Sequence, residues 1–221
     1  MKTLVVGDIQ GCFAEFQELL QLTSPDKIVA VGDLIDRGPD SLSVLIFFKN
    51  SLISQSVMGN HEWKHIQAFE TGTTTSFAVE SARNQIGPEL YPEAVQYMKK
   101  LPTYIDLPEA TVIHAFWEPH VPLHEQRADV LVGIASGEEY MQKVCDRPWW
   151  ELYDGDKPLI VGHHDYSKCG VPLIHNQNVY CIDTGCCYGR ALTGLVLPDF
   201  QLVTVRAKKN YWAQFRQTYN L

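Results

Sequence analysis

The organising stretch of this chain is Ile28-Val29-Ala30-Val31-Gly32-Asp33-Leu34-Ile35-Asp36-Arg37-Gly38. Its first four residues form an apolar run that is typical of a buried β-strand. Two carboxylates and a guanidinium follow at the carboxyl end of that strand, where α/β sheets bind their ligands. Carboxylates favour a cation and an arginine favours an anion, so Asp33, Asp36 and Arg37 indicate a metal-assisted reaction on a phosphate. From this stretch alone, a strand-to-loop turn with a surface ion pair is an equal alternative.

The composition is that of an ordinary globular protein. The chain has 221 residues, 45% of them hydrophobic and 20% charged, with a formal net charge of -8. We expect one domain over residues 1–221, because compact α/β domains of about this size are common. The acidic balance argues against a duplex nucleic-acid surface, which needs a basic stripe.

Targeting and membrane signals are weak in this sequence. Its longest apolar runs fall short of the ~20 residues that a membrane helix needs, which predicts no membrane partner. The apolar segment near the N-terminus is too short for a signal peptide. The six cysteines form no C-x-x-C pair, which favours reduced thiols and a cytoplasmic location.

Similar patterns lie on both sides of the organising stretch. The run Leu4-Val5-Val6 reads as a strand that ends in Gly7-Asp8-Ile9-Gln10-Gly11, with an amphipathic helix after it. Residues 51–58 read as a third strand that ends in Gly59-Asn60-His61-Glu62, and Pro39 suits the first turn of the helix before it. This repeated order of strand, turn and helix predicts a βαβαβ unit with a largely parallel sheet.

The rest of the chain has shorter patterns. Residues 103–107, 110–114, 159–161, 171–174, 179–182, 192–197 and 202–205 read as strands, and residues 93–101 and 138–144 as helices. Residues 71–102 and 117–157 could be insertions that cap the site or select the substrate.

Six of the expected strands are followed directly by polar side chains. These are Asp8 with Gln10, Asp33 with Asp36 and Arg37, Asn60 with His61, His114, His163, and Asp183. A lone histidine is usually a hydrogen-bonded structural residue, but six such strand ends in order favour one site.

Five short motifs give a resemblance to a known family. Residues 7–11 resemble GDxHG, residues 32–38 match GDxxDRG, and residues 59–62 match GNHE in full. His114-Ala115 and Gly162-His163 resemble two later histidine motifs. The chain therefore resembles the calcineurin-like metallophosphoesterases of the PPP type. Within residues 133–185, further motifs resemble a bacterial branch that includes the phosphatase domain of polynucleotide kinase-phosphatase, and residues 7–12 resemble symmetrical diadenosine tetraphosphate hydrolases.

The resemblance implies a fold and a cofactor. The fold would be α/β, a sandwich of two mixed β-sheets flanked by helices in four αββα layers. The cofactor would be two divalent metal ions, most often manganese, with iron, zinc, nickel and magnesium as alternatives. The implied metal ligands are Asp8, Gln10, Asp33, Asn60, His114 and His163, with Asp33 bridging the two ions.

The resemblance also implies how phosphate would react. A hydroxide that bridges the metals would attack phosphorus in line. Arg37 and Asn60 would bind phosphate oxygens, and Arg147 is a candidate second clamp. His61 would protonate the leaving oxygen, held in position by Asp36.

Several assignments leave alternatives open. Asp183 would orient a ligand histidine, but it could simply close a tight Asp-Thr-Gly turn. Arg127 and Arg190 are rivals to Arg147 for the second phosphate contact. Gln10 stands where the family motif has histidine. An amide oxygen is a weaker ligand than imidazole, so we expect a looser first metal site, unless Gln10 only hydrogen-bonds and water completes the shell.

Aromatic residues form a further feature near the expected site segments. They are Trp117, Trp149, Trp150 and Tyr188. Such rings could stack on a nucleobase, although core packing is their more common role.

Three functions follow, in this order. The leading hypothesis is a dinuclear metallophosphatase that acts on phosphomonoesters, either phosphoserine and phosphothreonine in proteins or small and nucleotide phosphates. The second is hydrolysis of dinucleoside polyphosphates such as diadenosine tetraphosphate. The third is a phosphate-binding module that has lost catalysis, against which the intact set of Asp8, Asp33, Asn60, His61 and His163 argues. The expected partner is a phosphorylated substrate. The sequence does not indicate whether the chain forms oligomers.

Overall fold

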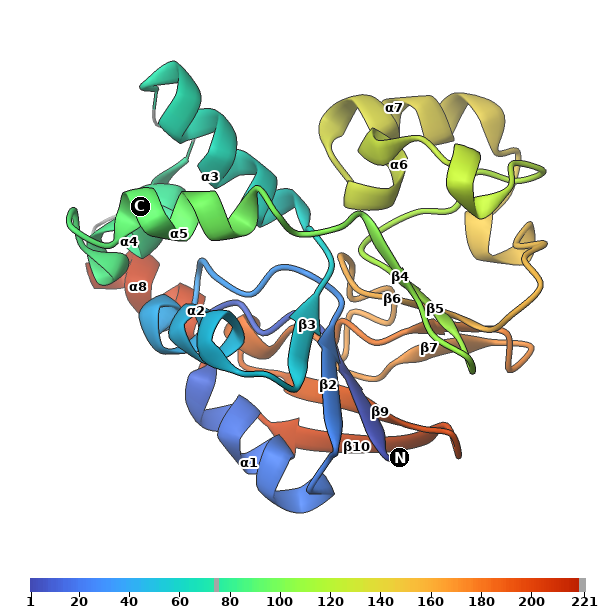
Figure 1. Ribbon diagram of the computed structural model, residues 1–221, viewed down its shortest axis with the longest axis horizontal. Coiled ribbons are helices and arrows are strands. Elements are labelled where there is room, and N and C mark those ends of the chain that lie inside the picture. The colour runs from blue at the N-terminus through green and yellow to red at the C-terminus, as the bar shows by residue number, and fades with distance from the viewer. Residues whose placement is uncertain (74–75, 219–221) are drawn as a thin grey trace.

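The computed structural model describes residues 1–73 and 76–218, and within them the chain forms two five-stranded sheets (Figure 1). The first sheet has the order β10-β9-β1-β2-β3 and the second has the order β4-β5-β6-β8-β7. The strands of the first sheet are β1 (Thr3–Val6), β2 (Lys27–Ala30), β3 (Ser54–Ser56), β9 (Ala191–Leu197) and β10 (Gln201–Arg206). Those of the second are β4 (Tyr104–Asp106), β5 (Thr111–Ile113), β6 (Leu159–Val161), β7 (Leu173–His175) and β8 (Val179–Cys181).

Helices connect and cover these strands. The α-helices are α1 (Phe13–Thr23), α2 (Ser41–Asn50), α3 (Asn60–Thr71), α4 (Phe77–Ile86), α5 (Tyr91–Met98), α6 (Ala128–Val132), α7 (Ala135–Val144) and α8 (Tyr211–Thr218). Short 3-10 turns are η1 (Leu123–Glu125), η2 (Trp149–Glu151) and η3 (Cys186–Tyr188). In the part of the chain that the structure describes, no helix is both long and apolar enough to cross a membrane.

The predicted βαβαβ unit is present in the first sheet. The strands β1, β2 and β3 are parallel, with Leu4 opposite Ile28 and Ile28 opposite Ser54. The late strands β9 and β10 join antiparallel on the other side of β1, so the sheet is mixed. The second sheet is also mixed, because β4 and β7 pair antiparallel with their neighbours while β5, β6 and β8 are parallel. The sequence-based expectation of two mixed sheets flanked by helices is confirmed.

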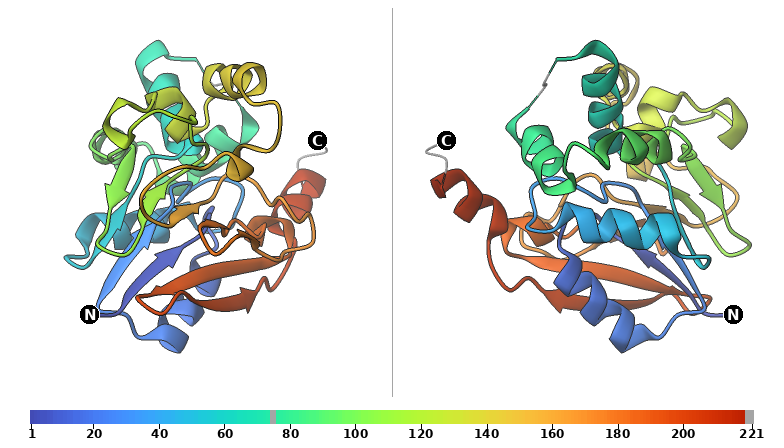
Figure 2. Two further views of the ribbon diagram at one scale, coloured as in Figure 1. Left: turned by 90° about the vertical axis from the view of Figure 1, so that its right-hand side faces the viewer. Right: turned by 60° about the vertical axis from the view of Figure 1, so that its left-hand side comes forward.

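Side-chain alternation along the strands produces the layers. In β1, Leu4 points into a core shared with Phe16 of α1, while Val5 points into a second core between the two sheets. In β6, Ile160 faces that inter-sheet core, and Leu159 faces a third core beneath α6 and α7. Figure 2 (right) shows α1 and α2 lying side by side against the first sheet. Three apolar cores therefore separate four layers in the order helix, sheet, sheet, helix.

The two expected insertions are helical. In residues 71–102, α4 and α5 pack beside α3, and residues 74 and 75 of this range lie outside the described residues. Residues 117–157 hold η1, α6, α7 and η2. The sequence predicts Pro39 in the first turn of the second helix, and this prediction is wrong. This proline precedes α2, because the Asp40 side chain accepts a hydrogen bond from the Ser43 amide (3.0 Å) and makes Asp40 the N-cap.

Candidate active site

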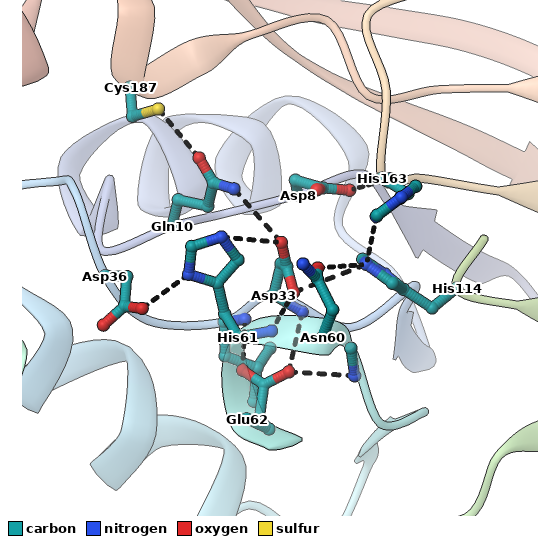
Figure 3. A network of polar contacts seen from close by, with 12 residues as sticks. Asp8, Gln10, Asp33, Asp36, Asn60, His61, Glu62, His114, His163 and Cys187 are labelled. Carbon is teal, nitrogen blue, oxygen red and sulfur yellow. Dashed lines mark hydrogen bonds and ion pairs between the residues drawn. The ribbon is translucent and has the colours of Figure 1, made fainter. Parts of the chain in front are cut away.

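The polar strand ends meet at one edge of the two sheets (Figure 3). Asp8 follows β1 and Asp33 follows β2, while His114 and His163 follow β5 and β6 of the second sheet. Asn60 is the first residue of α3, directly after the loop that leaves β3. Both sheets thus contribute side chains to the same cluster.

Three of these residues form a compact group of potential metal ligands. Ligand atoms of Asp8, Asp33 and His114, all buried, lie within 4.8 Å of one another. Oδ1 of Asp33 accepts a hydrogen bond from the His61 amide (3.0 Å) and lies 3.4 Å from Nε2 of His114. Burial alone would raise the pKa of Asp33, but the neighbouring His61 and His114 hold it well below its usual value. Asp33 is therefore a carboxylate in the centre of the group.

Hydrogen bonds orient the two strand-end histidines. Nδ1 of His114 lies 2.7 Å from the Val31 carbonyl oxygen and donates to it, so Nε2 is the ring nitrogen that directs its lone pair into the site. That Nε2 lies 3.2 Å from Nδ1 of His163 and accepts a hydrogen bond from the Asn60 side-chain amide (3.1 Å), whose oxygen accepts one from Nζ of Lys64. Burial lowers the pKa of both imidazoles, and the neighbouring His114 lowers the pKa of His163 further. Neutral imidazole is the form that binds metals.

Asp8 and His163 show that the site fits a cation. Oδ1 of Asp8 accepts a hydrogen bond from the His163 amide (3.0 Å). Among the described residues, Oδ2 of Asp8 and Nε2 of His163 are buried without a hydrogen-bond partner. Burial and the charges of Asp183 and Asp33 raise the pKa of Asp8 well above its usual value. An unpaired buried carboxylate is costly, and a divalent cation would remove that cost.

Gln10 turns its amide nitrogen, not its oxygen, toward Asp33. Nε2 of Gln10 donates to Oδ2 of Asp33 (3.2 Å), while Oε1 accepts from Sγ of Cys187 (2.8 Å). An amide nitrogen with two protons has no lone pair for a metal. In this orientation Gln10 hydrogen-bonds to the site, as in the alternative drawn from the sequence, and its ligation of a metal stays a prediction.

A chain of buried hydrogen bonds positions His61. Its Nδ1 lies 2.5 Å from Oδ2 of Asp36, and its Nε2 lies 3.7 Å from Oδ2 of Asp33. The other oxygen of Asp36 lies 2.7 Å from Nε2 of His65, whose Nδ1 contacts the Tyr91 hydroxyl at 2.9 Å. Burial would raise the pKa of Asp36, but the two histidines lower it well below its usual value. Asp36 is therefore a carboxylate that orients His61, and His65 holds Asp36 in turn.

Arg37 brings positive charge into the site cavity. This cavity has a volume of about 570 Å³, and its lining includes Asp33, Arg37, Asn60 and His61. The Arg37 guanidinium stacks on the Tyr188 ring, 5.5 Å from its centroid. A phosphate that enters this cavity would therefore meet a guanidinium, which favours anions.

The three candidates for a second arginine lie in different places. Arg190 lines the site cavity and pairs with Asp165. Arg147 is exposed, pairs with Asp146 (3.2 Å) and lines a neighbouring cavity instead. Arg127 pairs with Asp129 on the surface. Of these three, the structure brings only Arg190 to the predicted site.

Asp183 lines the same cavity, but its contacts are those of a turn. Its Oδ1 accepts a hydrogen bond from the Gly185 amide (2.9 Å), as expected for a tight Asp-Thr-Gly turn. Burial and the charge of Asp33 raise the pKa of Asp183 to about 6. Asp183 therefore adds negative charge close to Asp8, and its predicted hydrogen bond to a ligand histidine is not among its contacts.

Glu62 is a site residue for which the sequence predicts no role. Its carboxylate accepts hydrogen bonds from three backbone amides, those of Gly59 (3.0 Å), Asp33 (2.9 Å) and Leu34 (2.8 Å). It thereby locks the start of α3 onto the loop that carries Asp33. Glu62 is the last residue of the GNHE motif, but the type of side chain does not indicate which backbone amides it will bind.

The backbone at the site is strained. Positive φ angles occur at Gln10 (44°), Asp33 (50°), Asp36 (80°), Arg37 (59°) and His163 (71°). Each costs about 1–3 kcal/mol and persists only where surrounding contacts enforce it. Glycine is required at position 32 for two reasons. Its φ of 94° is unfavourable for other residues, and a Cβ there would lie 2.7 Å from the Gly59 nitrogen.

Comparison with known proteins gives consistent matches. A family model described as calcineurin-like phosphoesterase matches residues 1–189. An asymmetrical bis(5'-nucleosyl)-tetraphosphatase PrpE of Oceanobacillus iheyensis is 27% identical over 252 residues, covering 100% of this chain and 98% of that protein. A symmetrical bis(5'-nucleosyl)-tetraphosphatase of Shewanella sp. (strain W3-18-1) is 31% identical over 184 residues, 79% of this chain and 67% of that protein. A solved structure described as a "putative diadenosine tetraphosphatase" superposes with a TM-score of 0.77 at 26% identity, covering 93% of each chain.

Proposed function

Because this chain belongs to the calcineurin-like phosphoesterases, a family of metal-dependent phosphoric ester hydrolases, we propose that it hydrolyses dinucleoside polyphosphates. The observation that carries the proposal is the buried group of Asp8, Asp33 and His114, with Arg37 in the same cavity as Asp33. Relatives named for bis(5'-nucleosyl)-tetraphosphate hydrolysis, one of them matching over the whole chain, support the choice of substrate. This reverses the order of the two enzyme hypotheses drawn from the sequence.

The residues present fit two divalent metal ions. Asp8, Asp33, Asn60, His114 and His163 would hold them, and Asp33 would contact both. When bound, such ions polarise a phosphate and supply a nucleophile at neutral pH. We propose manganese, because mixed oxygen and nitrogen ligands suit it.

The chain's own residues would then position the phosphate and move one proton. Arg37 would bind non-bridging phosphate oxygens with its fork of N–H donors. His61, held by Asp36 through Nδ1, would carry a proton on Nε2 toward the leaving oxygen. Lys64 and Arg190 are further cations that line this cavity, and we propose that Arg190 contacts another phosphate of the substrate.

A phosphomonoesterase activity remains a second candidate, and one observation favours it. The buried pair of His61 and Asp36 is suited to protonating a poor leaving group such as an alkoxide. The leaving group of an anhydride is a phosphate, which needs that proton much less.

One substrate panel tests the proposal. The purified protein with Mn²⁺ is offered diadenosine tetraphosphate, a phosphoserine peptide and p-nitrophenyl phosphate, with Asp33→Asn as the inactive control. We expect the highest kcat/KM for diadenosine tetraphosphate, with products of ATP and AMP for asymmetrical cleavage or two ADP for symmetrical cleavage. A higher kcat/KM for either monoester would contradict the proposed substrate. Metal binding without activity on any of the three would indicate the binding module instead.

A further inference from the structure

A second cavity opens directly beside the site cavity. It has a volume of about 420 Å³, within the range of small-molecule pockets. Glu138 and His164 line both cavities, so the two lie next to each other. A ligand whose phosphate lies near Asp33 could therefore extend into the second cavity.

The walls of this cavity are aromatic and fixed. Phe116 and Trp149 are only 6% and 5% exposed, and their rings meet edge to face with centroids 6.4 Å apart. Nε1 of Trp149 donates a hydrogen bond to the Tyr166 hydroxyl (3.0 Å), and the Tyr166 ring packs on Trp150. Because these rings are held by the third core, the cavity is preformed.

The mouth of the cavity is polar. Gln142, Asp146 and Arg147 surround it and are exposed. The ion pair of Arg147 and Asp146 lies in solvent, where such pairs contribute little free energy. The guanidinium is therefore available to a ligand at the mouth.

We infer that this cavity binds the nucleobase of a nucleotide whose phosphate lies in the site cavity. An aromatic wall stacks on any base, because every base presents a flat π-face. Arg147 at the mouth would contact the sugar or a further phosphate. The inference rests on the proposed function, since it names where one nucleoside of the substrate lies. It also gives Trp149 a contact with substrate in addition to its role in the core.

The test compares two ligands that differ only in the base. AMP and ribose 5-phosphate are measured as competitive inhibitors of p-nitrophenyl phosphate hydrolysis by the Mn²⁺-loaded protein, or by calorimetric titration if that ester is not cleaved. We expect AMP to bind about tenfold more tightly than ribose 5-phosphate in the wild type. Trp149→Leu should reduce this ratio to about twofold or less.

Matched variants separate stacking from general damage. Trp117→Leu removes another buried tryptophan of the same core, which does not line this cavity, and should keep the tenfold ratio. If Trp149→Leu does not fold, Cys145→Leu narrows the cavity and should weaken AMP severalfold without affecting ribose 5-phosphate. Val144→Leu, an exposed neighbour outside the cavity, should change neither ligand.

Two outcomes would overturn the inference, and a third would separate it from the proposed function. Equal binding of AMP and ribose 5-phosphate by the wild type would do so even if diadenosine tetraphosphate is cleaved. Tighter binding of a phosphoserine peptide than of AMP, lost in Trp149→Leu, would assign the cavity to a peptide. Conversely, tight AMP binding that depends on Trp149, without any cleavage of diadenosine tetraphosphate, would support the cavity assignment while the proposed function fails.

Discussion

His61 is the residue whose chemistry separates the two candidate reactions. Asp36 fixes its Nδ1, and its Nε2 faces Asp33 at 3.7 Å. An alkoxide that leaves from a monoester needs a proton in the transition state, whereas a phosphate that leaves from an anhydride is already stable as an anion. The same side chain should therefore matter to different degrees in the two reactions.

We predict that His61→Asn lowers kcat on a phosphoserine peptide by about 10²–10⁴-fold, the usual contribution of a general acid. On diadenosine tetraphosphate the loss should be about tenfold. Both values come from initial rates at saturating substrate and Mn²⁺. His124→Asn, a change at an exposed histidine on η1, is the control and should leave both rates unchanged. Equal losses on the two substrates would show that His61 does not act on the leaving group.

Among individual residues, the sequence could predict the place of those that directly follow a strand. It could not predict contacts that depend on residues far away in the chain. Asp8 and Asp33 could be placed together because each follows a parallel strand. The orientation of the Gln10 amide could not be predicted, because it depends on Cys187, which is 177 residues away in the chain. The role of Glu62 was equally hidden, because its partners are backbone amides.

The element on which site geometry depends most is the start of α3. The Glu62 carboxylate joins this helix end to the loop after β2, and the His61 amide donates to Oδ1 of Asp33. Backbone amides therefore hold the start of α3 against Asp33, in addition to the side-chain contact of His61 with Asp36. The start of α3 and the loop after β2 act as one unit.

Glu62→Gln should loosen that unit. The glutamine amide would place N–H donors against backbone N–H groups, and hydrogen bonds to a charged acceptor contribute about 1.5–3 kcal/mol each. We expect the metal-loaded protein at pH 7.5 to lose about 2–3 kcal/mol of unfolding free energy and to bind Mn²⁺ more weakly. Denaturant unfolding and calorimetry measure the two effects. Glu70→Gln, on the same helix but exposed, should have neither, and similar losses there would refute a specific role for Glu62.

Local signals decided which elements could be predicted. The three repeats of strand, turn and helix were visible because each depends on neighbours in sequence. The order β4-β5-β6-β8-β7 was not, because strand order follows from contacts between distant segments. The same holds for the first sheet, where Thr3 pairs with Leu197. The helix α4 was not predicted either, and it packs against α2 and α3, which are distant in sequence or separated from it by a loop.

For the molecule as a whole, the site lies at the junction of the two sheets. Asp8 and Asp33 extend from the first sheet, while His114 and His163 extend from the second. A cation held between them would link both halves of the sandwich. A ligand that binds only the folded chain stabilises it by mass action, so metal removal should destabilise the whole fold.

The metal-free protein should also show a distinctive dependence on pH. Burial and the charge of Asp33 raise the pKa of Glu62 to about 8, and Asp8 is raised well above its usual value by burial, Asp183 and Asp33. These acids bind protons in the folded state that they do not bind in the unfolded state at pH 7. Stability from this source is present at low pH and is lost as the pH rises through the folded-state pKa values. Above pH 7 the lowered pKa values of His114 and His163 have only a small opposing effect, because most histidine is neutral in both states.

We therefore predict that unfolding free energy in EDTA falls by about 1–2 kcal/mol between pH 7 and pH 8, since one proton contributes up to about 1.4 kcal/mol per pH unit. Saturating Mn²⁺ should raise stability at both values and remove most of this slope, because the cation neutralises Asp8 and Asp33 and so favours the ionised Glu62. Buried thiols such as Cys187, whose pKa is raised by burial, contribute a smaller slope that metal does not change. The measurement is urea unfolding at the two pH values with and without metal, and Glu62→Gln removes one titrating group and should flatten the EDTA slope. An equal slope with and without Mn²⁺ would mean that the cation does not bind at these carboxylates.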